Sequence, residues 1–347
     1  MKNKALIDAL NQQKTLPLAD LTQLIATADE QDRQYAADMA AEISRSRFGR
    51  DIYTRGIVEF SNYCKNDCYY CGIRRGNRQL ERFRLTDQQI MDCCQVGYQL
   101  GFRTFVLQSG EDMYFTDERM TAIIRAIKGR FPDCAVTLSL GEKERSTYEK
   151  YFAAGADRYL LRHETANSQH YARLHPPALT LANRMRCLRD LRDIGFQTGC
   201  GCMVGSPYQT AENLAEDLLF MADFKPHMVG IGPYLPHRDT PFRDMPPGSV
   251  EQTLLMLSLT RILLPSVLLP ATTALGTAQQ DGRILGILAG ANVIMPNLSP
   301  LDVRQQYELY DGKLGIHSDA REGAELLQKQ VATIGYRLLI DRGDYRD

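Results

Sequence analysis

Three cysteines in one short segment are the residues of this sequence with the clearest capacity for chemistry. Cys64, Cys68 and Cys71 lie in the stretch SNYCKNDCYYCGIRRGN, directly after the apolar run from 57 to 60. Their Cys-x3-Cys-x2-Cys spacing supplies three thiolates, whereas structural clusters and structural zinc sites normally have four protein ligands. A [4Fe–4S] cluster held by three thiolates has one iron that can bind a small chelating molecule and transfer an electron to it.

The elements that must position this segment alternate in type from residue 51 onward. Short apolar or β-branched runs predict eight strands, at 56–60, 104–108, 135–140, 158–162, 198–204, 228–231, 267–271 and 292–295. Segments with helical period separate them, at 86–100, 118–129, 144–153, 180–194, 211–224, 250–264 and 278–289. This alternation predicts a parallel sheet, and eight units in about 250 residues predict an α/β fold with a complete (β/α)8 TIM barrel. An open doubly wound sheet is the alternative.

Two further regions flank the predicted barrel. Residues 1–50 have helical period and predict an N-terminal helical extension, so that residues 51–347 form the barrel with its C-terminal helical segment. The C-terminal helix is expected at about 320–339, either below the barrel or along its side. Within the barrel, Thr86 and Gln89 form a possible capping box for the first long helix.

Composition limits the classes of partner. The 347 residues carry a formal net charge of −1, which gives no electrostatic case for nucleic acid or an anionic membrane as a partner. No run of 18 apolar residues occurs, and the N-terminus lacks the features of a signal peptide. Nine cysteines, an odd number with three in a ligand spacing, favour a reducing compartment. We expect a soluble, cytoplasmic protein.

Polar residues follow the predicted strands at the ends that meet at one mouth of a barrel. An amino acid sulfonium ligand on an open iron needs an acceptor for its ammonium group, a cation for its carboxylate, and partners for a ribose and an adenine. Side chains of those types are Gln108, Glu111, Arg162, Glu164 and Arg184.

Simpler readings compete with this one. The three cysteines would also suit a zinc site completed by a distant residue, or three separate core thiols. Arg162 and Glu164 would also suit a structural ion pair, and the hydroxyls at 272 and 273 would suit local backbone groups. The arginines at 74, 75, 78, 82 and 84 suit a solvated basic face, with a docking surface for an acidic electron donor as the sharper alternative.

The Cys-x3-Cys-x2-Cys motif, with Tyr70 just before the last cysteine, is the signature of the radical S-adenosylmethionine enzymes. The segments LLRHETAN, CLRDLRDIGFQTG, MVGIGPYLPHRDTP, TRILLP, LPATTALGT and GANVIMPN resemble the maturases of [FeFe]-hydrogenase within that superfamily. The resemblance spans about residues 50 to 315. It implies a complete (β/α)8 barrel, a cluster on the three cysteines, and S-adenosylmethionine as the second cofactor.

The resemblance also implies roles for single residues. Tyr70 would lie near the adenine, and Gln108, Ser109 and Glu111 would lie beside the methionine end and the ribose. Glu164 and Arg184 would contact the amino acid and sugar groups, with Arg162 close by. A deeper cavity for an anionic, polarisable substrate would be lined by Arg55, Thr137, Thr272, Thr273, Met295, Tyr307 and Tyr310.

The implied substrate is small and either organometallic or cysteine-derived, namely an iron that carries CO, cyanide and cysteine. The implied partners are the other hydrogenase maturases and an electron donor such as ferredoxin or flavodoxin. Many family members carry a second iron–sulfur cluster on C-terminal cysteines, but here no cysteine follows Cys202. We therefore expect one cluster only.

Three other functions stay open from the sequence. A methylornithine synthase-like mutase would need ammonium and carboxylate partners for a diamino acid. Biotin synthase would need cysteines on several barrel strands, where this chain offers Thr137 and Ser139. A non-catalytic, zinc-stabilised scaffold would explain the cysteines but not the polar residues at the mouth.

Overall fold

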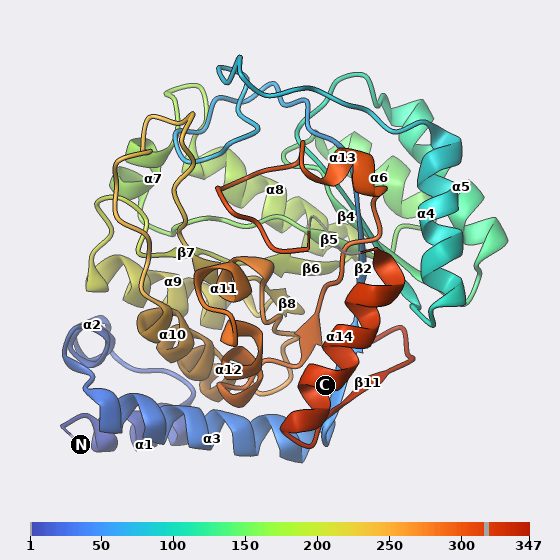
Figure 1. The fold of residues 1–347 in the computed structure, drawn as a ribbon. Coiled ribbons are helices and arrows are strands. Elements are labelled where there is room, and N and C mark those ends of the chain that lie inside the picture. The colour runs from blue at the N-terminus through green and yellow to red at the C-terminus, as the bar shows by residue number, and fades with distance from the viewer. Residues whose placement is uncertain (1, 316–318) are drawn as a thin grey trace.

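The computed structural model describes residues 2–315 and 319–347. As predicted, the first 50 residues are helical: α1 (Lys4–Gln13), α2 (Leu18–Thr27) and α3 (Glu30–Phe48). Leu10 and Leu24 belong to the same hydrophobic core as the strands and helices that follow, so the extension is packed onto the body of the protein. In Figure 1 these helices lie at the lower edge of the view, next to α10.

A parallel six-stranded sheet forms the centre of the molecule, with the strand order β2-β3-β4-β5-β6-β8. The strands are β2 (Gly56–Ser61), β3 (Thr104–Ser109), β4 (Ala135–Ser139), β5 (Arg158–Leu160), β6 (Gln197–Cys200) and β8 (Met228–Val229). All six coincide with predicted runs. Their apolar side chains are buried on both sides, as in parallel sheets covered by helices.

Helices connect consecutive strands and cover the outside of the sheet (Figure 1). They are α4 (Asp87–Gln99), α5 (Asp117–Arg130), α6 (Arg145–Ala153), α7 (Ser168–Leu174), α8 (Leu181–Ile194), α9 (Ala211–Phe224) and α10 (Val250–Leu263). The predicted capping box is present at α4, where Thr86 Oγ1 accepts from Gln89 N at 3.2 Å and Gln89 Oε1 accepts from Thr86 N at 2.8 Å. The sequence did not predict α7.

Single bridges continue the neighbour order beyond the six strands. Met228 pairs with Leu268, Pro270 pairs with Val293, and Asn297 pairs with Ile57 on β2. The predicted run 267–271 is therefore present as bridges and not as a regular strand. Pro265 lies just before this run and Pro270 lies within it, and proline lacks the N–H that a ladder requires. What the structure establishes is an α/β fold with a parallel six-stranded sheet.

Smaller elements complete the fold. The predicted run 198–204 is split at Gly201, whose φ is +150°, into β6 and the short strand β7. The remaining elements are β7 (Met203–Val204), β9 (Gly232–Pro233), α11 (Thr273–Ala278), α12 (Gly282–Leu288) and α13 (Leu301–Arg304). β7 and β9 pair in parallel.

The C-terminal region differs from the prediction of one helix over 320–339. α14 (Ala320–Thr333) ends before Gly335, whose φ of +75° is left-handed, and the chain returns as β11 (Arg337–Leu339). β11 pairs with β1 (Asp51–Thr54), which pairs on its other side with β10 (Val293–Ile294). Leu327 of α14 packs with Ile52 of β1, so the helix lies along the side.

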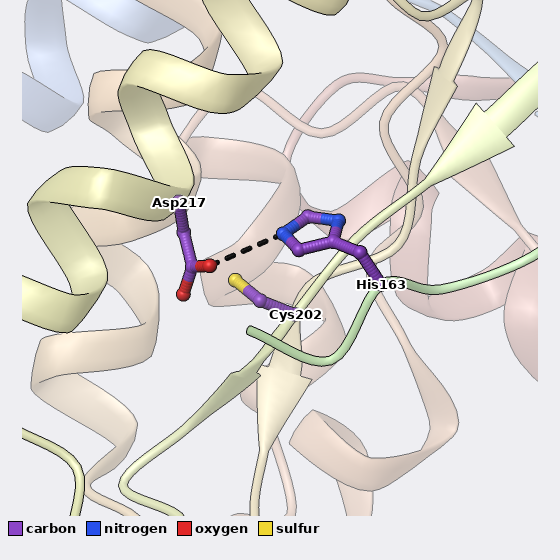
Figure 2. A group of neighbouring side chains, drawn as sticks. All are labelled: His163, Cys202 and Asp217. Atoms are coloured by element: carbon purple, nitrogen blue, oxygen red, sulfur yellow. Dashed lines mark hydrogen bonds and ion pairs between the residues drawn. The ribbon is translucent and has the colours of Figure 1, made fainter. Parts of the chain in front are cut away.

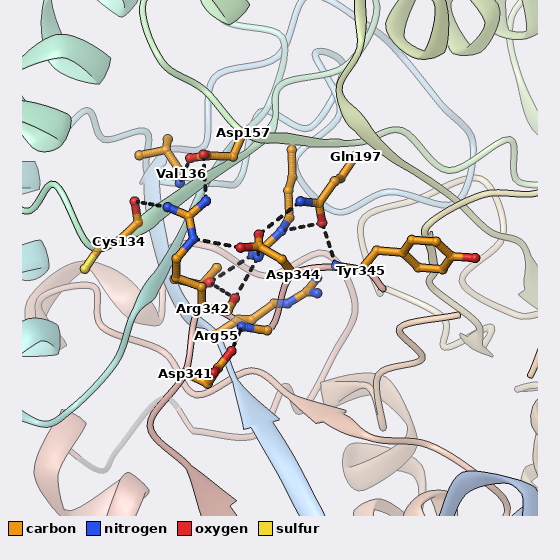
Figure 3. Close-up of polar contacts among 12 residues, drawn as sticks. Arg55, Cys134, Val136, Asp157, Gln197, Asp341, Arg342, Asp344 and Tyr345 are labelled. Atoms are coloured by element: carbon orange, nitrogen blue, oxygen red, sulfur yellow. Dashed lines mark hydrogen bonds and ion pairs between the residues drawn. The ribbon is translucent and has the colours of Figure 1, made fainter. Parts of the chain in front are cut away.

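The last residues close the end of the sheet where the strands begin (Figure 3). Asp344 pairs with the fully buried Arg158 at 2.5 Å and accepts from Gln197 Nε2 at 3.0 Å. Arg342 pairs with Asp157 at 2.9 Å. We call residues 341–345 the floor segment. None of the described helices combines the length and the apolar character that crossing a membrane requires.

Candidate functional site

Cys64, Cys68 and Cys71 lie in the long loop between β2 and α4, which crosses the top of Figure 1. All three are partly exposed. Gly110, at the end of β3, lies against this loop, because a Cβ there would be 2.7 Å from Cys64 Cβ and would collide with the carbonyl oxygen of Tyr63. The close approach of the two segments therefore requires glycine.

Arginines hold the loop in shape. Arg82 donates to the carbonyls of Ile73 at 2.8 Å and Arg74 at 2.6 Å, and Arg84 pairs with Asp112 at 2.7 Å. The simplest sequence interpretation, a solvated basic face, thus does not hold for the half-buried Arg82, whereas Arg84 is exposed. The three cysteines therefore lie in a loop whose backbone carbonyls accept hydrogen bonds from the Arg82 side chain.

The pKa values and the spacing of the three thiols both bear on what this loop can bind. Burial, and then the neighbouring thiols, raise the pKa of Cys68 well above its ordinary value, and burial raises the pKa of Cys71 to about 12. In the described part of the chain, two groups have ligand atoms that all lie within 4.8 Å of one another, and neither includes these cysteines. Ligands of a single tetrahedral zinc lie only about 4 Å apart. The wider spread suits thiolates that bind different irons of one cluster.

Tyr70 is held by a neighbouring histidine. His175 Nδ1 lies 2.9 Å from the carbonyl of Tyr171, so this nitrogen carries the proton, and Nε2 accepts from the Tyr70 hydroxyl at 3.2 Å. Burial lowers the pKa of His175 to about 4, so the ring is neutral near pH 7. Sequence reasoning missed His175.

Gln108, Ser109 and Glu111 lie at the end of β3 and just after it, as predicted. Glu111 is buried, accepts from Glu142 N at 2.9 Å and pairs with Lys65 at 3.1 Å. The Gln108 amide donates to the Tyr307 hydroxyl at 3.4 Å, and Ser109 Oγ donates to the Gly110 carbonyl at 2.7 Å.

Arg162, Glu164 and Arg184 form a connected group next to the loop. Arg162 pairs with Glu164 at 2.8 Å, while Arg184 pairs with Glu142 at 2.6 Å and donates to the Arg162 carbonyl at 2.6 Å. Burial raises the pKa of Tyr70, and the charges of Glu164 and Arg184 both act on this tyrosine. The charges of Glu164 and Arg184 also act on Cys68, so these two groups lie near the cysteine loop.

Arg55 and Thr137, two residues of the predicted substrate cavity, are both buried. Arg55 is buried, its Nη1 lies 2.8 Å from Met228 Sδ, and its Nε and Nη2 atoms have no hydrogen-bond partner. The buried hydroxyl of Thr137 also has none. Buried polar groups without partners are rare, and here they consist of a cation and a hydroxyl that suit an anion.

The other predicted cavity residues differ in their surroundings. Thr272 caps α11 by accepting from Leu275 N at 3.3 Å, which agrees with the local-backbone reading. Thr273 and Met295 line a cavity of about 440 Å³ together with Arg283. Tyr307 is buried beside Gln108, and burial raises the pKa of Tyr310, on which the charges of Arg283 and Arg162 also act.

Two buried ion pairs, Lys313 with Glu59 and Arg184 with Glu142, were not predicted. Lys313 pairs with Glu59 at 2.5 Å, and Asn297 Nδ2 donates to the same carboxylate at 2.7 Å. The signal for Glu59 was present, since a single charge interrupts the apolar strand GIVEFS. Nothing in the sequence connected Glu142 with Arg184.

The two groups of described residues with ligand atoms close enough for a metal ion are His163, Cys202 and Asp217, and His237, Glu308 and Asp311. In both, the Nδ1 of the histidine accepts from a backbone N–H, of Gly201 at 3.2 Å and of Asp239 at 3.1 Å. A neutral imidazole then carries its proton on Nε2, so that Nε2 has no lone pair for a metal. Figure 2 shows His163 pointing this nitrogen at the Asp217 carboxylate, 3.2 Å away.

A family model described as the Radical SAM superfamily matches residues 58–221, which include the cysteine loop and β2 to β6. The [FeFe] hydrogenase maturase subunit HydE of Thermotoga maritima is 46% identical over 297 residues, covering 86% of this chain and 84% of that protein. The chain belongs to the HydE family. As a radical S-adenosylmethionine enzyme of this family, it binds a [4Fe–4S] cluster and S-adenosylmethionine.

Relatives outside the HydE family share the architecture. The 3-methylornithine synthase of Methanosarcina acetivorans is 26% identical over 83% of this chain and 82% of its own length. The crystal structure of methylornithine synthase (PylB) aligns with a TM-score of 0.84 at 25% identity, covering 96% of this chain and 97% of that one. The crystal structure of HydG aligns with a TM-score of 0.81 over 97% of this chain and 76% of its own, at 19% identity, which shows the fold alone.

Proposed function

We propose that this HydE-family protein acts in the assembly of the [FeFe]-hydrogenase active site. It cleaves S-adenosylmethionine reductively and uses the radical on an iron precursor that carries CO, cyanide and cysteine. The buried Arg55, a cation with two unpartnered nitrogens, is the observation that carries the substrate assignment, because it requires an anionic guest.

Cys64, Cys68 and Cys71 would hold the cluster, which would supply the electron for reductive cleavage of the bond between the sulfonium sulfur and C5′. The protein's own residues would bind and orient the sulfonium. Glu164 and Arg184 would contact its amino acid and sugar groups, and Tyr70 its adenine. The same set would include Arg162, Gln108, Ser109 and Glu111.

Deeper in the protein than the S-adenosylmethionine site, Arg55 and Thr137 would bind the anionic precursor. The space around it would be lined by Thr272, Thr273, Met295, Tyr307 and Tyr310. The cysteine sulfur of the precursor would be the atom presented to the radical. Exclusion of water is essential, because water and stray hydrogen donors would consume the radical.

We infer that the six strands and the bridged segments act as a closed (β/α)8 barrel around this space. The single bridges from Met228 to Leu268, from Pro270 to Val293 and from Ile57 to Asn297 support this proposal. The floor segment would seal the opposite end. We further propose that residues 1–50 form an extension of the domain 51–347, that the protein is cytoplasmic, and that ferredoxin or flavodoxin is the electron donor.

A methylornithine synthase-like mutase is the nearest alternative by fold. Such an enzyme must bind two ammonium groups of a diamino acid. The buried carboxylate found on β2, that of Glu59, is already paired with Lys313, whereas Arg55 offers an unpaired positive charge. These charges favour an anionic substrate.

The test is anaerobic maturation of [FeFe]-hydrogenase with the other maturases, with this protein omitted and then restored. We expect hydrogenase activity only when the protein is present together with S-adenosylmethionine. A parallel reaction with an unbranched diamino acid that is an isomer of methylornithine tests the mutase. Formation of methylornithine, or full hydrogenase activity without the protein, would reject the proposal.

A further inference from the structure

Glu164, proposed above to contact S-adenosylmethionine, has a strained backbone. Its φ is +67°, in the left-handed region that residues other than glycine rarely adopt. Such a conformation costs about 1–3 kcal/mol and persists only where the surrounding structure enforces it. Something must therefore hold this residue, and the contacts around it identify what does.

One carboxylate binds the chain on both sides of Glu164. Asp217 Oδ1 lies 3.2 Å from His163 Nε2 and accepts from Ala166 N at 2.6 Å. Asp217 comes from α9, while His163 and Ala166 directly flank the strained residue and its neighbour. Figure 2 shows the carboxylate facing the imidazole, with Cys202 beside them.

His163 connects this carboxylate to the next strand. Its Nδ1 accepts from Gly201 N at 3.2 Å, which fixes the tautomer so that Nε2 donates to Asp217. Glu164 itself donates its N–H to the Gly201 carbonyl at 3.0 Å. His163 and Asp217 have fully buried side chains, so water cannot replace these contacts.

We propose that Asp217 is a positioning residue that acts through His163 and Ala166 to hold Glu164 in its left-handed conformation, and thereby sets the affinity for S-adenosylmethionine. The inference rests on the proposed contact between Glu164 and that cofactor. Asp217 has a structural reason to be a carboxylate or amide, because only an oxygen at the Oδ1 position can accept both hydrogen bonds.

The test uses the anaerobically reconstituted holoenzyme, with dithionite as reductant and 5′-deoxyadenosine as the measured product. We expect Asp217→Ala to raise the KM for S-adenosylmethionine about tenfold, with kcat within about twofold. Asp217→Asn keeps the acceptor and should restore a KM near that of the wild type. Asp223→Ala, which removes an exposed carboxylate from the same helix, is the matched control and should change neither constant.

A double-mutant cycle separates positioning from general damage. If Asp217 acts through Glu164, then Asp217→Ala should raise KM no further in a Glu164→Ala background. If Asp217→Ala does not retain iron, His163→Gln takes its place in the cycle. This variant removes only the imidazole that connects Asp217 with Gly201. It should raise the KM for S-adenosylmethionine when Glu164 is present and should not raise it further in a Glu164→Ala background.

The outcomes are distinct. An unchanged KM in Glu164→Ala would reject the proposed cofactor contact and this inference with it. A raised KM in Glu164→Ala, together with unchanged KM in the Asp217 and His163 variants, would overturn the positioning role alone. Equal effects of Asp217→Ala with and without Glu164 would likewise overturn it.

Discussion

At the scale of single residues, a few buried polar atoms define the chemistry. Arg55 is a buried cation with two nitrogens that have no hydrogen-bond partner, Thr137 is a hydroxyl without one, and Tyr70 is oriented by a neutral His175. Each arrangement costs free energy in the folded protein unless a ligand or a neighbour compensates it. The atoms of Arg55 and Thr137 that have no partner therefore indicate where a bound molecule would supply hydrogen bonds.

Cys68→Ala should abolish both the cluster and all reductive cleavage of S-adenosylmethionine, because two thiolates cannot hold a [4Fe–4S] cluster firmly. Cys94→Ala is the matched control, since Cys94 is a fully buried core thiol of α4. Iron content, the visible spectrum and 5′-deoxyadenosine formation provide the measurements. Cleavage at the wild-type rate in Cys68→Ala would contradict the cluster assignment.

Arg55→Met should separate stability from function. Removal of an unpaired buried charge that also lies near Arg158 should raise the free energy of unfolding by roughly 1 kcal/mol. The same change should lower hydrogenase maturation at least about tenfold while S-adenosylmethionine cleavage continues.

Denaturant unfolding and the maturation assay measure the two effects of Arg55→Met. Arg125→Met, on the exposed face of α5, controls for loss of an arginine and should change neither. A variant at position 55 with full maturation activity would show that the guanidinium does not bind the substrate.

At the scale of elements, local signals and long-range contacts contribute differently. α4 begins where its capping box predicted, and α9 coincides with the predicted run 211–224. The floor segment carries no such signal, because Asp344 acquires its partners Arg158 and Gln197 only when distant segments meet. For the same reason, the sequence identified Arg184 but not the Glu142 that orients it.

Thr86→Ala should lower the free energy of unfolding by about 1 kcal/mol, because it removes the side-chain acceptor for the Gln89 N–H at the start of α4. Thr86→Ser keeps the hydroxyl and should retain most of the stability. Urea unfolding followed by circular dichroism measures both. Equal stability of the alanine variant would mean that the cap contributes nothing.

Asp344→Asn should destabilise the protein at pH 7 by roughly 3 kcal/mol, because it leaves the fully buried Arg158 without its counterion. Burial alone would raise the pKa of Asp344, but Arg342 and Arg158 outweigh it and hold the pKa well below its ordinary value. A lowered carboxyl pKa gives stability above the unfolded pKa of about 3.9 that is lost as the pH falls below it.

The difference between wild type and Asp344→Asn should therefore be constant from pH 7 to about pH 5 and shrink below pH 4. Urea midpoints across this range provide the measurement. Asp347→Asn, an exposed carboxylate three residues further on, serves as the control. A difference that grew on acidification would contradict the ion pair.

At the scale of the whole molecule, the sequence predicted the class of fold and the reactive loop, because both follow from local patterns. The strand ends predicted Gln108, Arg162 and Glu164 as site residues in the same way. The sequence could not predict the strained backbone of Glu164 or the Arg55 nitrogens without hydrogen-bond partners. Both depend on how segments that are distant in the sequence lie next to one another.

At the same scale, we expect one cluster per chain, because no cysteine follows Cys202 in the given sequence. The anaerobically reconstituted protein should contain about four irons. Iron and protein analysis of the same sample measures the ratio. A stable content near eight irons would show a second cluster with ligands other than C-terminal cysteines.

The floor segment has a consequence for the order in which the protein becomes competent. Arg342 and Asp344 contact Thr104, Arg158 and Gln197, which precede them by about 150 to 240 positions. Contacts between residues so far apart in the sequence form late in folding, because closing a long loop costs entropy before the contacts can stabilise the protein. During synthesis on the ribosome, the floor segment thus cannot close the beginning of the sheet until residue 344 has emerged. Until then, the buried Arg158 lacks its ion pair with Asp344.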